Sequence, residues 1–193
     1  MAVTRRRNAI IQEEQESDDS NAPPHLRHLD AALGNGDPDA LRRALDNLVG
    51  SIDEPIENGD TALHLACVYG NHTCVQILLE RGASLEAKDG DGEIPLHGAC
   101  AAGYANIVQL LLNKGNDMNI VKKMLESVDE EGDTPLHHAA RAEHVNVIQL
   151  LLANGASPTT TNFSGQIPSE LADAETHAKE ILTNAVDNYV DSR

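Results

Sequence analysis

The chain has 193 residues, with 31 acidic and 14 basic side chains and a formal charge of -17. Such a charge repels phosphate backbones and anionic lipid headgroups, so we expect no nucleic-acid binding and no membrane binding. The same charge is explained equally well as a means of keeping an extended surface soluble.

The composition predicts one domain with a thin helical core. Only four residues are aromatic and Trp is absent, so the apolar positions are nearly all Ala, Leu, Ile and Val. That composition favours packed helices over a β-sandwich. A chain of this length fits one compact unit better than two.

Residues 1–24 carry no repeated pattern, and we predict that they are disordered. Arg5, Arg6 and Arg7 are a weak nuclear-import signal, and the acidic residues from Glu13 onward exclude a secretory signal. No run approaches the ~18 apolar residues that would span a bilayer. We therefore expect a soluble protein of the cytoplasm, the nucleus or both.

A repeated pattern dominates the rest of the chain. Residues 61–67 (TALHLAC) recur as 94–100 (IPLHGAC), as 134–140 (TPLHHAA) and more faintly as 167–172. Leu63 and Leu96 are 33 residues apart, whereas Leu96 and Leu136 are 40 apart, so one interval holds seven extra residues. Residues 29–45 fit the same template, which makes five units.

Each of the three clear units continues with a second apolar segment, in residues 74–79, 107–112 and 147–152. Apolar spacings of three and four place these side chains on one face of a helix. The segments end at Gly82, Gly115 and Gly155, where we expect a left-handed residue to stop the helix.

The combined pattern resembles the ankyrin repeat: a Thr-Pro-Leu-His start, an Ala pair, a Gly between two helices and a Val-x-x-Leu-Leu helix closing on Gly. The resemblance covers about residues 25–186 and implies an all-α solenoid of about five helix-turn-helix repeats. We place the repeats at 25–55, 56–88, 89–128, 129–161 and 162–186, followed by a C-terminal tail, 187–193. Such stacks bury each helix pair against the next repeat.

His64, His97 and His137 occupy one repeated position and lie a whole repeat apart, so they cannot converge on one ion. The resemblance implies a structural role, a hydrogen bond from each ring to the neighbouring loop. We expect His138 and His144 to be solvent-facing or packing residues. Cys67, Cys74 and Cys100 lack metal-ligand spacing and are interpreted as reduced core residues.

No catalytic triad, phosphate loop or carboxylate pair can be assembled from the sequence, so we expect no enzymatic activity, no cofactor and no metal. Ankyrin-like stacks usually bind proteins through the turns between repeats and the exposed side of each first helix. Carried over to this chain, the resemblance implies a protein-binding surface. Its residues are Glu57, Asn58, Asp60, Val68, Tyr69, Asp91, Glu93, Ala101, Ala102, Glu130, Glu131, Asp133, Arg141, Ala142, Phe163, Ser164 and Gln166.

Seven of these side chains are acidic and Arg141 is the only cation, which favours a partner with a basic segment. An adaptor or assembly chaperone is the first hypothesis, and a monomer is expected. Ordinary turn chemistry explains the acidic residues equally well. The alternative function is a docking regulator or inhibitor of an enzyme, such as a kinase or a ubiquitin ligase component. Tyr69 and Phe163 are the candidate binding hot spots.

The seven-residue insertion lies within residues 120–128 and predicts an apolar, helical piece. It either presents Met124 and Leu125 near the binding rim or folds back on the stack. At the C-terminal end, Ser169 and Glu170 replace the Leu-His pair, and we expect them to make that end of the stack hydrophilic.

Overall fold

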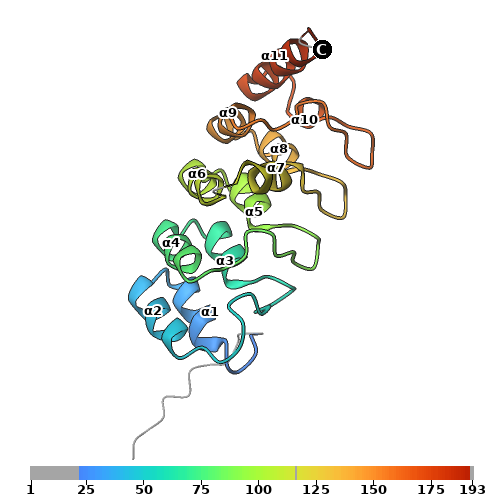
Figure 1. Ribbon diagram of the computed structural model, residues 1–193. Coiled ribbons are helices and arrows are strands. Elements are labelled where there is room, and N and C mark those ends of the chain that lie inside the picture. Colours follow the sequence, from blue (N-terminus) through green and yellow to red (C-terminus); the bar gives the residue numbers. More distant parts are fainter. Residues whose placement is uncertain (1–21, 116, 192–193) are drawn as a thin grey trace, which may run out of the picture.

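The computed structural model describes residues 22–115 and 117–191 and consists of helices stacked in pairs (Figure 1). Each pair is one repeat, and loops project from one side of the stack. The pairs are α1 (Arg27–Gly34) with α2 (Pro38–Asp46), α3 (Ala62–Val68) with α4 (His72–Glu80), α5 (Pro95–Ala101) with α6 (Ala105–Lys114), α8 (Pro135–Arg141) with α9 (Val145–Ala153), and α10 (Pro168–Leu171) with α11 (His177–Asp191). The predicted all-α solenoid of five repeats is confirmed.

The N-terminal segment predicted to be disordered falls almost wholly outside the described residues. Of its 24 residues, only 22–24 are described, and Ala22 is buried against the core. Helix α1 begins five residues later, at Arg27.

The helices begin where the sequence supplies a suitable first turn. Pro95, Pro135 and Pro168 occupy the first helical positions, where a missing N–H has no intrahelical partner to lose. At α2, Oδ1 of Asp37 accepts hydrogen bonds from the N–H groups of Asp39 and Ala40 at 2.9 and 3.0 Å. These bonds lower the pKa of the Asp37 carboxyl group.

The hydrophobic core runs through all five repeats. Helices α3, α5, α8 and α10 pack in series, and alanines at 66, 99 and 139 are fully buried between them. These small side chains allow the close approach, and Leu and Ile of the second helices fill the remaining space. The core interpretation of Cys67, Cys74 and Cys100 is confirmed, since all three are buried and burial raises the pKa of each thiol.

The turns inside the repeats are covered by a side chain of the following repeat. Gly36, Gly70 and Gly103 all have positive φ angles, as predicted for the interhelical position of Gly36. The Tyr104 ring lies over Gly70, and the His144 ring lies over Gly103. Nε2 of His144 also lies 3.0 Å from the carbonyl oxygen of Ala101, which confirms that His144 is a packing residue.

The insertion forms an additional helix, α7 (Met118–Glu126), which folds back on α8. Met124 and Leu125 are buried there and do not reach the binding rim. The left-handed conformation predicted at Gly115 is wrong, because its φ is -67° while Gly82 and Gly155 have φ of 88° and 94°. The chain enters α7 at this point instead of the usual turn, and Val121 of α7 packs on Gly115.

The last repeat has a long second helix and departs from the prediction at Ser169. Helix α11 continues to Asp191, so the tail expected at 187–193 is helical up to that residue, and 192–193 lie outside the described part. Ser169 is buried, because Lys179 of α11 covers it and donates a hydrogen bond to its carbonyl oxygen. Glu170 is exposed, and its Oε2 accepts the N–H of Ile167 at 2.8 Å in the position held elsewhere by histidine.

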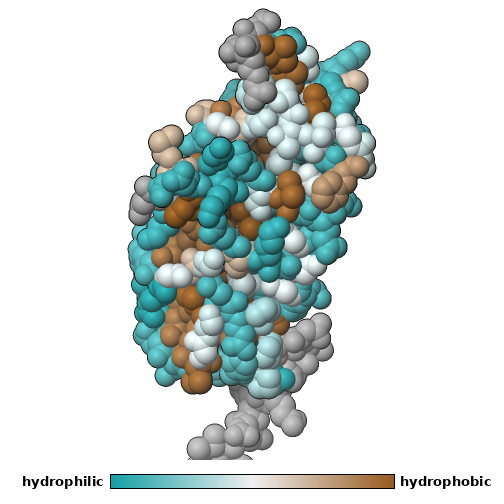
Figure 2. Space-filling model, turned by 45° about the vertical axis from the view of Figure 1, so that its right-hand side comes forward, coloured by the Kyte–Doolittle hydropathy of each residue, from teal (hydrophilic) through white to brown (hydrophobic). Residues whose placement is uncertain are grey.

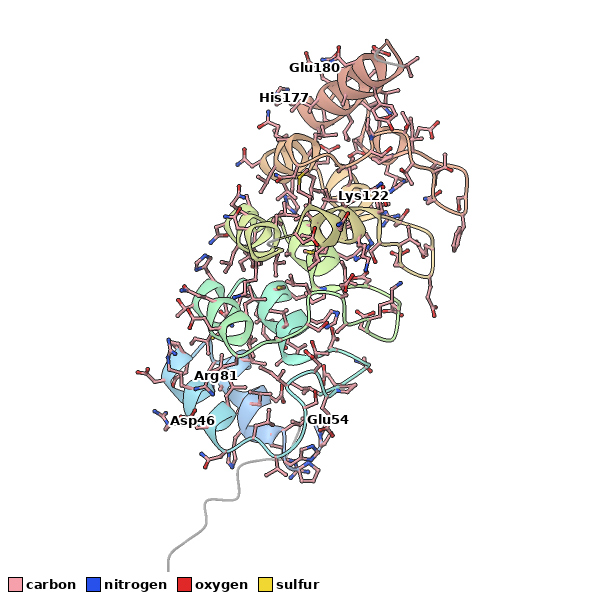
Figure 3. All side chains as sticks on the ribbon, viewed as in Figure 1. Asp46, Glu54, Arg81, Lys122, His177 and Glu180 are labelled. Carbon is pink, nitrogen blue, oxygen red and sulfur yellow. The ribbon has the colours of Figure 1, made fainter. Side chains whose placement is uncertain are left out.

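An ion pair between exposed side chains links the first two repeats on the side of the stack away from the loops (Figure 3). Arg81, which follows α4, lies 2.6 Å from Asp46 of α2 (Figure 3). Both side chains are well exposed, so we expect the pair to contribute at most about 1 kcal/mol to stability.

Candidate protein-binding surface

The loops that project between repeats are narrow hairpin-like turns, which we call fingers: residues 56–60, 89–93, 129–133 and 162–166. Each finger is closed by a hydrogen bond from its first N–H to its last carbonyl. These bonds measure 2.7 Å for Ile56 to Asp60, 3.0 Å for Asp89 to Glu93, 3.2 Å for Asp129 to Asp133 and 2.9 Å for Asn162 to Gln166. The fingers therefore share one backbone form.

A side chain at the first position holds three of the fingers together from inside. Oδ1 of Asp129 accepts the N–H groups of Glu131 and Asp133 at 2.9 and 2.8 Å. Asp89 and Asn162 make the same pair of bonds in their own fingers. Ordinary turn chemistry therefore accounts for Asp89 and Asp129, neither of which is among the seven predicted binding acids.

Adjacent fingers are also joined to one another. The N–H groups of Gly90, Glu130 and Phe163 donate to carbonyl oxygens of the preceding finger, at 3.0, 2.9 and 3.0 Å. Gly90 approaches the Asn58 carbonyl so closely that any Cβ at position 90 would lie 2.5 Å from that oxygen. The four fingers thus form a continuous row with a fixed spacing.

Three buried histidines connect this row to the helices. Nε2 of His64, His97 and His137 lies 3.1, 3.3 and 3.1 Å from the last carbonyl of the next finger. Nδ1 of each ring accepts the N–H three residues earlier, at 3.1 to 3.2 Å. Burial is the main cause that lowers the pKa of all three rings. The structural role implied by the resemblance is confirmed.

The structure brings the sequence-predicted binding residues to one side of the stack, with differing exposure. The exposed ones are Asn58, Val68, Tyr69, Asp91, Ala101, Glu130, Glu131, Arg141, Ala142, Phe163 and Ser164. The partly buried ones are Glu57, Asp60, Glu93, Ala102 and Gln166. We call the exposed and partly buried residues together the finger face.

Asp133 is a correction, because it is fully buried and unavailable to a partner. Its Oδ1 accepts a hydrogen bond from Nδ2 of Asn162 at 2.8 Å, and its Oδ2 pairs with the Arg141 guanidinium. The acids at this position in the two preceding fingers, Asp60 and Glu93, are only partly buried, whereas Asp133 is turned inward because Asn162 follows in the next finger. The charge of Arg141 is therefore largely committed to Asp133.

Sequence reasoning missed the environment of His138, whose side chain is 12% exposed. Nε2 of His138 lies 2.8 Å from Oδ2 of Asp129 and 3.7 Å from Oε1 of Glu93, and its ring meets the His97 ring edge-on. His138, Asp129 and Glu93 border a cleft of about 400 Å³ between two fingers. The sequence held a hint of this environment. Position 138 aligns with Leu65 and Gly98 in the two preceding repeats, so a histidine replaces residues without a polar side chain.

The electrostatics of the finger face reflect an excess of carboxylates. Burial and the nearby charges of Asp89, Glu57 and Asp91 raise the pKa of Asp60 to about 6. Burial also raises the pKa of Glu93, helped by the neighbouring aspartates and opposed by His138. Carboxyl groups that resist ionisation mark a surface on which an added positive charge is stabilising.

Three apolar side chains stand exposed on this face. Val68 and Tyr69 at the end of α3 are 47% and 46% exposed, and Phe163 on the last finger is 76% exposed. Figure 2 shows this side of the molecule as mostly hydrophilic, with narrower hydrophobic bands between the hydrophilic residues. Exposed aromatic residues beside acidic ones are typical of protein interfaces.

Comparison with known families agrees with this architecture. The family model described as ankyrin repeats (3 copies) matches residues 28–122 and 91–162, which together span more than half of the chain. The chain belongs to the ankyrin repeat family. Ankyrin repeats are general protein–protein interaction modules, typically without catalytic activity, and the finger face is the surface on which these repeats expose their loops. A search of curated proteins gave no match. Within the described part of this ankyrin stack, no helix is long and apolar enough to cross a membrane.

Proposed function

We propose that this ankyrin repeat protein is a monomeric, non-catalytic adaptor or assembly chaperone that acts in the cytoplasm or nucleus. Its finger face binds a protein segment rich in Lys and Arg. The observation that carries the proposal is the row of exposed or partly exposed acids on fingers whose backbones are fixed to one another. A rigid acidic row loses little entropy when a basic segment docks on it.

Tyr69, Val68 and Phe163 supply the apolar contacts that such a segment needs. Charge alone accelerates association and discriminates between partners, whereas buried aromatic side chains contribute most of the affinity. The preferred ligand is therefore a segment in which basic residues alternate with a few apolar ones.

The test is a pull-down with the full chain, quantified by mass spectrometry, in which Glu130→Lys/Glu131→Lys is compared with wild type. Asp173→Lys/Asp187→Lys is the matched control, because both residues are exposed, lie near α11 and produce the same change in net charge. We expect the first variant to lose its main partners by at least tenfold and the control to keep them. Equal capture by both variants would exclude the finger face as the binding surface.

Salt gives a second readout on the same partner. Raising the salt from 0.15 M to 0.5 M shortens the Debye length from about 8 Å to roughly 4 Å, so capture through the acidic row should fall. Undiminished capture would contradict the basic-segment proposal.

The exposed Val68, Tyr69 and Phe163 favour a second candidate function, docking on a folded enzyme such as a kinase or a ubiquitin ligase component and regulating it. For that function, Tyr69→Ala and Phe163→Ala would abolish capture while the charge-reversal variant and 0.5 M salt would leave it intact.

A further inference from the structure

Three side chains with metal-ligating atoms converge at the mouth of the cleft between the 89–93 and 129–133 fingers. They are Glu93 of the first finger, Asp129 of the second and His138 of α8. One atom from each lies within 4.8 Å of the other two. Among the residues that the structure describes, this is the one group of three or more such side chains with that spacing.

The distances fit a small tetrahedral ion. Nε2 of His138 lies 2.8 Å from Oδ2 of Asp129 and 3.7 Å from Oε1 of Glu93. Zinc ligands at ~2.0–2.1 Å from the metal are separated from one another by about 3.3 Å, which lies between these two values. The third separation, between oxygens of Glu93 and Asp129, is at most 4.8 Å, so coordination of one ion requires Glu93 to move towards the other two ligands.

The chemistry of the set distinguishes it from a patch of acids. One imidazole nitrogen with two carboxylate oxygens suits Zn²⁺ and related transition-metal ions, whereas Mg²⁺ and Ca²⁺ prefer oxygen ligands alone. Two carboxylates also compensate the two charges of the ion. The cleft leaves the fourth position open to water.

The neighbouring groups leave the site accessible. The Arg141 guanidinium at the edge of the cleft pairs with the buried Asp133 and lies 3.9 Å from Glu131, so it is held by other partners. Oδ1 of Asp129 stays bonded to two N–H groups of its own finger, which orients Oδ2 towards His138. Asp91 and Glu130 also line the cleft and add negative charge around it.

We propose that Glu93, Asp129 and His138 bind one divalent transition-metal ion of the Zn²⁺ type. The ion replaces the hydrogen bond between His138 and Asp129 and is coordinated by Nε2 of the neutral imidazole. It links two adjacent fingers to α8 and thereby stiffens the centre of the finger face. The competing occupant of the cleft is a Lys or Arg side chain of a protein partner.

The test uses the full chain, freed of metal with a chelator that is then removed, and titrated with ZnCl₂ in a calorimeter. We expect one Zn²⁺ per chain, and binding at least tenfold weaker in His138→Gln and in Glu93→Gln. His28→Gln is the matched control, since His28 is exposed on α1 and lies outside the group. Co²⁺ in place of Zn²⁺ should give a visible absorption spectrum that His138→Gln removes.

Two readouts keep the proposal testable if a variant unfolds. In the wild-type chain, the ring resonances of His138 should shift on addition of one equivalent of Zn²⁺, and a hundredfold excess of Mg²⁺ should not reverse the shift. Absence of stoichiometric binding, displacement by Mg²⁺, or equal affinity in all variants would overturn the proposal. A lysine-rich peptide that perturbs His138 when Zn²⁺ does not would assign the cleft to a partner's side chain instead.

Discussion

Nε2 of His97 lies 3.3 Å from the carbonyl oxygen of Asp133, so a ring in one repeat supports the finger of the next. Nδ1 of the same ring accepts the N–H of Ile94 at 3.1 Å, which assigns the proton to Nε2. The 89–93, 129–133 and 162–166 fingers are thus each fixed by a histidine that is itself fixed by its own helix start. The finger face and the stability of the stack depend on the same side chains.

Replacing His97 with Ala should destabilise the protein strongly. The substitution removes both hydrogen bonds of a fully buried ring and leaves a cavity between α5 and the next finger. We expect a loss of about 3 kcal/mol in the free energy of unfolding, measured by urea denaturation. Exposed His28→Ala is the control and should change stability by less than about 0.5 kcal/mol. A loss below 1 kcal/mol for His97→Ala would contradict the supporting role.

The buried histidines should make the protein sensitive to acid. Burial, with a smaller effect from His138, lowers the pKa of His97 from 6.5 to about 4, so the folded state favours the neutral ring. The contribution of the neutral His97 ring to the free energy of unfolding is complete above pH 6.5. It is lost as pH falls towards 4, because the ring takes up a proton in the unfolded chain before it does so in the folded one. For His97 alone the loss is roughly 3 kcal/mol.

The difference between wild type and His97→Gln isolates this titration. With a chelator present, the stability gap between them should be widest above pH 6.5 and shrink steadily towards pH 4. Asp60 acts in the opposite direction, since its raised pKa makes it less destabilising below about pH 6, but it is common to both proteins and cancels. A gap that is constant with pH would show that the ring does not titrate as described.

Most of the fold was readable from the sequence because the repeat supplies the same information several times. The first-turn residues and the alanine positions reflect local requirements of one helix pair, and the structure fulfils them in every clear unit. The interhelical glycine is present in two of these units, as Gly70 and Gly103, and in the third Glu143 takes its place with a positive φ of 58°. The errors lie where the repeat is broken. Gly115 leads into α7, so it does not adopt the left-handed conformation that ends the other second helices.

The binding surface was less predictable, because exposure depends on contacts between repeats. Asp133 occupies a position that is partly exposed in the other fingers, yet Asn162 of the next finger and Arg141 of α8 turn it inward. The grouping of His138 with Glu93 and Asp129 likewise joins residues from two repeats. Neither arrangement follows from one unit alone, since each requires the distance between neighbouring units.

The ion pair between buried Asp133 and exposed Arg141 should be important for stability, although the position of Asp133 suggested a binding role. In Asp133→Ala, the Arg141 charge and the amide of Asn162 both lose their partner. We expect a loss of about 2–4 kcal/mol in chemical denaturation. Asp91→Ala, at an exposed position of the preceding finger, is the control and should be near neutral. If the two variants were equally stable, the contacts of the Asp133 side chain with Asn162 and Arg141 would not contribute to stability in solution.

The glycine turns should tolerate no side chain where the next repeat covers them. Gly103 has a φ of 79°, and a Cβ there would lie 2.6 Å from the His144 ring. In Gly103→Ala, the strained backbone and the displaced ring should together lower the free energy of unfolding by about 2–3 kcal/mol. They should also loosen the packing between α5 and α8. Gly34→Ala is the matched control, because Gly34 ends α1 with no atom within 4 Å of an added Cβ. We expect that control to be neutral or stabilising by up to about 1 kcal/mol, since alanine favours the helix. Thermal unfolding of both variants decides the matter: equal melting temperatures would mean that the His144 ring does not rest on Gly103.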